Sequence, residues 1–192
     1  MLNNYRLWIE NSEFVDLDVN HSFNILSVAK GTMADNIVIK KSKFKNISGS
    51  ILKLDAETDN YGIYNAEYVN IHDSTFDNIG GAIVDYYRGG TDESTFGPHF
   101  SMTDSLVSNV GSAKKNWNKT SLYLHGVQVS HVEGNRFENN LPLLINHTVG
   151  EPVTKFINNE FVNTRIPEVN ELNSIKTDTA TFLNNTHIKS RN

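Results

Sequence analysis

The segment from Asp85 to Pro98 carries side chains that could bind or transform an acidic ligand. It interrupts an otherwise repetitive chain with a glycine-bearing polar loop whose ionisable residues are Asp85, Tyr86, Tyr87, Arg88, Asp92 and Glu93. Loops held on a rigid framework often carry binding and catalytic groups. A guanidinium such as that of Arg88 can bind a carboxylate through two parallel hydrogen bonds. This segment is therefore the first candidate functional site.

Two columns of outward side chains extend this candidate over neighbouring repeats. The short apolar segments that follow each turn can be aligned on their turns, with a register uncertainty of one residue. One column then contains Lys53, Asp85, Tyr123 and Asn146. The other contains Asp55, Tyr87, His125 and either His147 or Thr148. A flat face lined with charged and aromatic groups suits an extended sugar polymer, whereas the alternative is an ordinary solvated surface.

The side-chain types on this face suggest distinct roles toward such a polymer. Lys53 and Arg88 are expected to bind carboxylates, and Tyr87 and Tyr123 are expected to stack on sugar rings. His125 or His147 is expected to bond hydroxyls. If the chain were a catalyst by itself, Tyr87 or His125 would act as the base beside Arg88.

Metal binding by this chain has weak support. Asp92 and Glu93 could ligate calcium through oxygen, but an ion pair of either residue with Arg88 explains them more simply. His125 and His147 could form a zinc pair, yet no third ligand stands at a clear spacing. We therefore predict no metal and no cofactor in this chain.

Composition excludes several classes of partner. The chain has 192 residues, a formal net charge of −5 and a pI of about 5.8, whereas nucleic-acid binding needs a basic surface. It has no cysteine, hence no disulfide or thiolate metal site. No apolar run reaches the length of a membrane span. We predict neither a nucleic-acid nor a membrane partner.

A short turn motif recurs through the whole chain. Its occurrences are Asn11–Phe14, Lys41–Phe44, Asp73–Phe76, Thr103–Leu106, Gly134–Phe137, Asn158–Phe161 and Asn184–His187. Their last residues are 24 to 32 positions apart. An alternating segment typical of a short strand precedes most of these turns, and a second follows several of them.

This periodicity predicts an all-β fold, a single-stranded right-handed parallel β-helix of about six to seven coils. A β-sandwich is the alternative, but it would not keep one turn motif at this period. Residues 1–192 would form one domain, with an irregular cap or tail over 165–192. Because the first repeat begins almost at residue 1, we expect the natural protein to continue upstream or this end to be covered.

Three segments resemble the C-terminal β-helix domain of polysaccharide lyase family 6, the group of alginate lyases and chondroitinase B. They are Tyr87–Pro98, Leu124–Gln128 and His147–Thr154, and the resemblance extends over roughly 36–164. It adds Gln128 to the candidate substrate-binding residues. It also implies an acidic polysaccharide as partner and a secreted or periplasmic location.

The resemblance implies that catalysis in this family belongs to a separate N-terminal β-helix with a lysine base, an arginine and a calcium ion. Leu124-His125-Gly126 has leucine where that arginine would stand, and no matching Lys-Ser pair is found. We therefore expect this chain to be the second half of a β-eliminating lyase, lining the groove and stabilising the catalytic half. The alternatives are a stand-alone polysaccharide-binding module and a lyase active without a partner.

Overall fold

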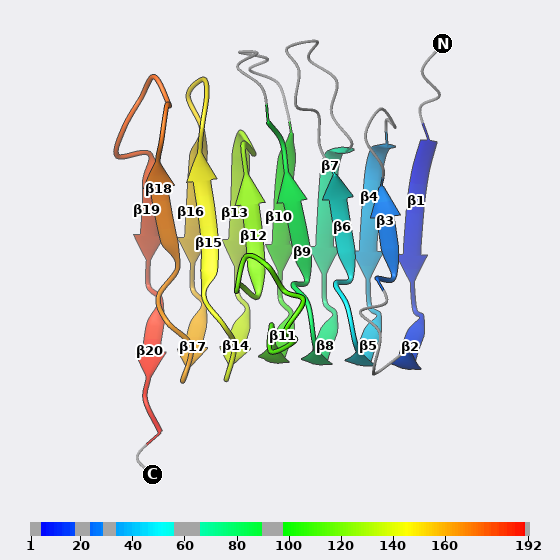
Figure 1. The fold of residues 1–192 in the computed structure, drawn as a ribbon. Coiled ribbons are helices and arrows are strands. Elements are labelled where there is room, and N and C mark those ends of the chain that lie inside the picture. Colours follow the sequence, from blue (N-terminus) through cyan, green and yellow to red (C-terminus); the bar gives the residue numbers. More distant parts are fainter. Residues whose placement is uncertain (1–4, 18–23, 29–33, 56–65, 90–97, 191–192) are drawn as a thin grey trace.

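The chain folds into a solenoid of β-strands, with its first strand at one end and its last strand at the other (Figure 1). The computed structural model describes residues 5–17, 24–28, 34–55, 66–89 and 98–190. These residues contain strands and no α-helix. Within this described part, accordingly, no helix is available to cross a membrane.

Three parallel sheets run along the solenoid. Sheet A contains β1 (Tyr5–Glu10), β4 (Ala34–Lys40), β7 (Ala66–His72), β10 (His99–Thr103), β13 (Val129–Glu133), β16 (Val153–Ile157) and β19 (Ala180–Leu183). Sheet B contains β2 (Glu13–Leu17), β5 (Lys43–Ile47), β8 (Thr75–Ile79), β11 (Leu106–Val110), β14 (Arg136–Glu138), β17 (Glu160–Val162) and β20 (Thr186–Ile188). Sheet C contains β3 (Leu26–Val28), β6 (Leu52–Asp55), β9 (Val84–Tyr87), β12 (Leu122–His125), β15 (Leu143–His147) and β18 (Glu168–Glu171).

Each strand pairs in parallel with the strand three places further along the chain, so three consecutive strands form one coil. The predicted all-β parallel β-helix is therefore confirmed. Because like positions of successive coils lie in register, the repeat in the sequence becomes a set of ladders in space.

The corner between sheets A and B explains the recurring turn motif. Its first residue has a positive φ in every coil, from 46° at Asp73 to 68° at Gly134, and Asn, Asp and Gly tolerate this conformation best. Its second residue accepts a hydrogen bond from the backbone amide of the same position one coil earlier. This ladder joins Ser12, Ser42, Ser74, Ser105, Asn135, Asn159 and Asn185, with donor–acceptor distances of 2.9–3.2 Å.

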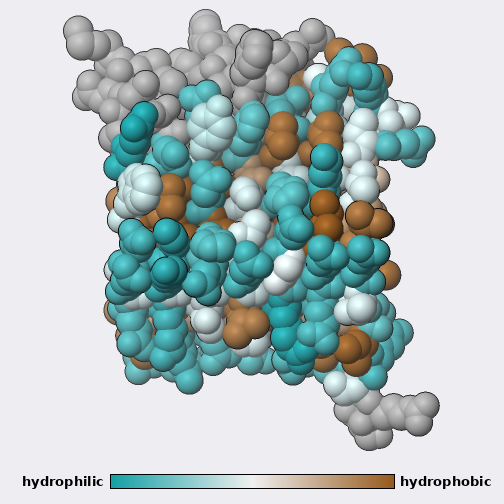
Figure 2. All heavy atoms as spheres, turned by 180° about the vertical axis from the view of Figure 1, so that it is seen from behind, coloured by the Kyte–Doolittle hydropathy of each residue, from teal (hydrophilic) through white to brown (hydrophobic). Residues whose placement is uncertain are grey.

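The aromatic position of the motif fills the interior. Phe14, Phe44 and Phe76 stack with ring centroids 5.0 and 5.2 Å apart, and Phe137 stacks on Phe161 at 5.3 Å. These stacks join one core with inward Ile, Leu and Val side chains from all three sheets. The surface seen from behind is mostly hydrophilic, with scattered hydrophobic residues (Figure 2).

Two predicted details are wrong. In the fourth repeat the inward position is Val107 and not Leu106, because Val107 pairs with Phe76 while Leu106 is 54% exposed. The motif there begins at Asp104, one residue later than expected. The predicted irregular cap or tail over 165–192 is regular in its described part, residues 165–190, where β18, β19 and β20 add one strand to each sheet.

Candidate functional site

The outer face of sheet C gathers most of the predicted site residues. In the pairing register, Lys53 lies beside Asp85 and Asp85 beside Tyr123, which is the first predicted column. Asp55, Tyr87 and His125 are likewise neighbours in the second column. Strand alternation turns Lys53, Asp85, Tyr87 and His125 outward, while the residues between them enter the core.

The fourth position of each column differs from the prediction. Tyr123 pairs with Leu144, and His125 pairs with Asn146. Asn146 therefore belongs to the second column, and the strand turns His147 inward. His147 is fully buried, and its Nε2 lies 2.9 Å from Thr154 Oγ1. Placing His147 on the outer face was thus wrong, because the position beside His125 belongs to Asn146, one residue earlier, and a shift of one residue exchanges the two faces of a strand.

Two other predicted ligand-binding residues lie inside. Arg88 is 1% exposed, and its backbone amide donates to the carbonyl of His125 at 2.8 Å. Gln128 is also buried, and its Nε2 donates to the carbonyl of Val149 at 3.0 Å. Gln128 therefore stabilises a corner between coils. Because Arg88 and Gln128 are buried and do not line the outer face, ligand binding by them stays a prediction.

Four side chains form a compact cluster on the outer face. The rings of Tyr87 and His125 stack with centroids 4.4 Å apart, and Tyr87 is 39% exposed. His125 Nδ1 lies 3.2 Å from Tyr123 Oη and 3.2 Å from Asn146 Nδ2. Asn146 Oδ1 in turn accepts a hydrogen bond from Asn170 Nδ2 at 3.1 Å. The bond from Asn170 orients the Asn146 amide with its Nδ2 toward the histidine.

This arrangement determines how the histidine can interact. An amide nitrogen can only donate, so His125 Nδ1 accepts and a neutral ring carries its proton on Nε2. Burial lowers the pKa of His125, which favours that neutral form. Burial also raises the pKa of Tyr123, which keeps its hydroxyl protonated. The cluster is therefore an uncharged donor–acceptor surface suited to sugar hydroxyls.

A glycine fixes the backbone next to the cluster. Gly126 has φ = 76°, and a Cβ at this position would collide with the carbonyl oxygen of Arg88. A side chain there would push apart the coils that carry Tyr87 and His125. The Leu124-His125-Gly126 sequence thus places one residue in the core, one on the face and one in the corner.

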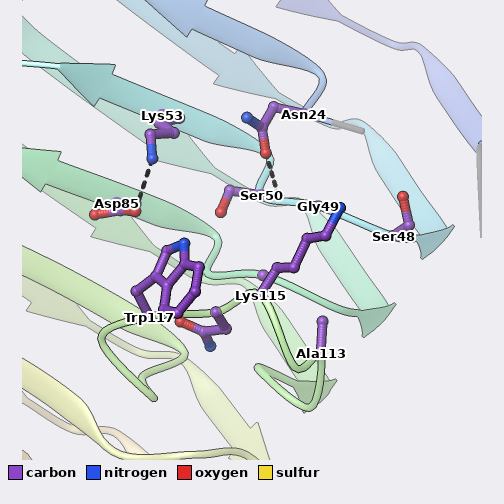
Figure 3. Close-up of a pocket in the computed structure, with 11 residues that line it drawn as sticks. Asn24, Ser48, Gly49, Ser50, Lys53, Asp85, Ala113, Lys115 and Trp117 are labelled. Atoms are coloured by element: carbon purple, nitrogen blue, oxygen red, sulfur yellow. Dashed lines mark hydrogen bonds and ion pairs between the residues drawn. The ribbon is translucent and has the colours of Figure 1, made fainter. Parts of the chain in front are cut away.

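A hollow of about 190 Å³ opens beside the cluster. Lys53 and Asp85 line one side, and the loop between β11 and β12 lines the other with Lys115 and Trp117 (Figure 3). The Lys53 Nζ lies 3.9 Å from Asp85 Oδ2, and Asn118 Nδ2 donates to Asp85 Oδ1 at 3.1 Å. The hollow and the cluster are adjacent because Asp85 and Tyr123 are paired neighbours.

Comparison with known proteins shows which family of structures this chain is similar to. A scan against protein-family models and a search of curated proteins each found no match. Among solved structures, an arginine-to-alanine mutant of the PL6 family alginate lyase AlyGC matches at 44% identity with a TM-score of 0.92. The structure of AlyGC itself matches at 41% identity with a TM-score of 0.87. The resemblance to polysaccharide lyase family 6 is confirmed.

The similarity to the family 6 lyase covers 97% of this chain, which is more than the three segments that first suggested it. The chain spans about a quarter of the lyase's length, 26%. This partial coverage agrees with the prediction of a further domain and does not identify that domain.

The family resemblance did not draw attention to Trp117 and Lys115, which line the hollow, or to Asn118, which donates a hydrogen bond to Asp85. Their signal in the sequence was the loop 111–121, whose polar run with an isolated tryptophan precedes an apolar strand. Asp92 and Glu93, the weak calcium candidates, lie outside the described residues. Among the described residues there is no cluster of three His, Asp or Glu side chains able to hold a metal ion.

Proposed function

We propose that this chain is an accessory domain of a polyuronate lyase of the alginate lyase type. It lines one wall of the substrate groove and stabilises a separate catalytic β-helix. The observation that carries the proposal is the 41–44% identity to a PL6 alginate lyase over 97% of this chain and 26% of that one. A chain that matches one quarter of an enzyme in sequence and fold suits a domain that lies next to the catalytic domain and supports it.

The parent reaction would be β-elimination. A base removes the C5 proton of a uronate, the electron pair forms the C4–C5 double bond, and the 4-O-linked sugar leaves. This step requires a neutralised carboxylate and a positioned base. In the proposal those groups, with a calcium ion, belong to the catalytic half. We also propose a secreted or periplasmic location, which rests on the resemblance to this lyase family.

The outer face of sheet C supports the wall function. The Tyr87–His125 stack presents rings to solvent, and the largely buried Tyr123 and Asn146 hold His125 through neutral hydrogen bonds. Sugars offer the complementary surfaces, since their ring faces are apolar and their hydroxyls both donate and accept. This face therefore fits a polysaccharide, and the similarity to an alginate lyase supports an acidic one.

Two assays test the proposal. Absorbance near the ultraviolet edge reports the unsaturated uronate product, and alginate retards a binding protein in a native gel. We expect no product from this chain alone and restored product when the upstream catalytic half is added in trans. Product from the chain alone would instead assign it the whole reaction, with Tyr87 or His125 as base. Gel retardation without restored turnover would assign it a stand-alone binding function.

A further inference from the structure

We propose that the hollow beside Trp117 binds one uronate unit of an acidic polysaccharide. Trp117 would lie against the sugar ring, and Lys115 and Lys53 would bind the carboxylate. This inference rests on the proposed function and adds a binding site to it. The site uses three residues that the groove-wall argument does not need.

Trp117 is unusually exposed for its size. Its side chain is 82% exposed, whereas tryptophans in folded proteins are buried to a large extent on average. An indole that stays in water does not contribute the favourable free energy that burial of its apolar surface would give. An exposed tryptophan over a polar hollow is therefore best explained by a ligand that covers it, and a sugar ring has a matching flat apolar face.

The loop that carries Trp117 is held in a defined conformation. Asn116, buried at the base of the loop, donates through Nδ2 to the carbonyls of Gly111 at 2.8 Å and Thr120 at 2.7 Å. The Ala113 amide donates to the Gly80 carbonyl at 2.9 Å, which fastens the loop to the preceding coil. Binding therefore loses little loop entropy, because the ring is already presented.

The charges around the hollow favour an anion. Lys53 and Lys115 supply two positive charges against the single carboxylate of Asp85. Asp85 is already engaged by Lys53 and Asn118, while within the described part of the chain no carboxylate pairs with Lys115. Figure 3 shows Lys115 extending toward the Gly49–Ser50 corner, at the edge of the hollow. A ligand carboxylate there would meet a cation that no carboxylate of the described residues already neutralises.

Small residues on the floor create the space. Ser48, Gly49, Ser50 and Gly81 line it, and a Cβ at Gly81 would collide with Ser50. Ser50 is fixed from two sides, since its amide donates to Asn24 Oδ1 at 2.8 Å and its Oγ accepts from the Ala82 amide at 3.1 Å. The floor is therefore rigid, and its volume suits a single sugar unit and not a longer segment.

The position of the hollow lets a polymer continue from it. Lys53, Asp85 and Tyr123 occupy paired positions on three successive coils, and neighbouring parallel strands lie about 4.8 Å apart. A chain that leaves the hollow past Asp85 thus reaches Tyr123 and then the stacked rings of Tyr87 and His125. The hollow and the cluster would bind successive units of one polymer.

Tryptophan fluorescence tests the site, because the chain has two tryptophans, Trp8 and Trp117. A Trp8→Phe variant leaves Trp117 as the single reporter, and we expect alginate oligosaccharides to change its emission. Calorimetry should show about tenfold weaker binding for Trp117→Ala. Lys115→Ala should weaken binding and reduce its salt dependence. Matched controls are Trp8→Ala and Lys114→Ala, which alter an exposed residue of the same type outside the hollow and should bind as the unmodified chain does.

Each outcome separates this inference from the proposed function. Alginate binding that survives both Trp117→Ala and Lys115→Ala would overturn the site and leave the accessory role intact. Equal binding of neutral oligosaccharides would overturn the assignment to uronate. No alginate binding by the unmodified chain would overturn the site, while restored turnover in trans tests the accessory role independently. Unchanged thermal midpoints in the variants would show that weaker binding is not a loss of folding.

Discussion

The ladder at the corner between sheets A and B predicts a specific ranking of substitutions at Asn135. This residue is buried, and its Oδ1 accepts the amide hydrogen of buried Ser105 at 3.0 Å. Its Nδ2 donates to the carbonyls of Met102 at 2.9 Å and Glu133 at 3.1 Å. Asn135→Ala leaves the Ser105 amide without a partner and removes a donor from each carbonyl. An unsatisfied buried polar group costs about 1–3 kcal/mol, so we expect a loss of roughly 2–4 kcal/mol.

Serine at the same position should cost much less. Ser42, Ser74 and Ser105 fill this ladder position in other coils, where each Oγ accepts from the amide of the preceding coil and donates to a local carbonyl at 2.9 Å. Asn135→Ser therefore keeps the bond from Ser105 and should cost about 1 kcal/mol.

Thermal unfolding followed by circular dichroism measures the difference. For a chain of this size, about 1 kcal/mol shifts the midpoint by about 2–4 °C, so Asn135→Ala should melt roughly 4–16 °C lower. Asn173→Ala, at an exposed position, is the control and should leave the midpoint unchanged. Equal losses for alanine and serine would refute the reasoning, because the accepted hydrogen bond would then contribute nothing.

Two further predictions concern the corner glycines and pH. Gly126→Ala should destabilise the chain strongly, because φ is 76° and the new Cβ would collide with the backbone carbonyl of Arg88. Gly134→Asn should be tolerated, because asparagine occupies this turn position in other coils and the new Cβ would meet only the end of the Asp104 side chain, at 2.7 Å, which can move. Equal thermal midpoints for the two variants would contradict this. Burial lowers the pKa of His147 and His125, so the unfolded chain binds more protons at these sites than the folded chain does. Stability should therefore be complete above about pH 6.5 and fall as the pH drops below that value. Midpoints measured from pH 5 to 8 should show a smaller acid dependence in His147→Gln, and an unchanged dependence would exclude His147 as a source.

The solenoid was predictable from the sequence because one turn motif marks both the ends of the strands and the stacking of the coils. The residues of that motif form the turn within each coil and also the hydrogen-bonded ladder between coils. Sheet B was harder to recognise, because its strands coincide with the x-Phe-x-Asn part of the motif. Asn46, Asn78 and Asn139 there adopt a positive φ of 54–56°, which reads as a turn although the preceding residues are paired strands.

The site was predictable only in part, for a geometric reason. Lys53 and Asp85 could be aligned because each stands nine residues after the core phenylalanine of its coil, Phe44 or Phe76. Tyr123 follows the longer loop 111–121 in the coil after them. The next coil has a shorter corner, where the Ser121 amide donates to the carbonyl of Pro142 at 2.8 Å and thereby sets the register. No residue type in the sequence marks that offset, and an error of one position in a strand exchanges an outward side chain for a buried one. His147 was misplaced for this reason.

The distribution of charge explains why sheet C and not sheet B would meet an acidic polymer. On sheet B, cations are paired across coils, with Lys43 2.7 Å from Glu13, Lys45 3.7 Å from Asp77, and Arg136 bridged to both Glu138 and Glu160. Such pairs nearly cancel each other's field, so an approaching carboxylate gains little and must compete with a partner already present. At the hollow on sheet C, Lys53 is paired with Asp85 in the same way, but Lys115 of the adjoining loop adds a second cation. The neighbouring cluster holds no carboxylate. The protein has a net charge of −5. The local excess of positive charge at the hollow would therefore allow a polyanion to bind to this face and not be repelled from it.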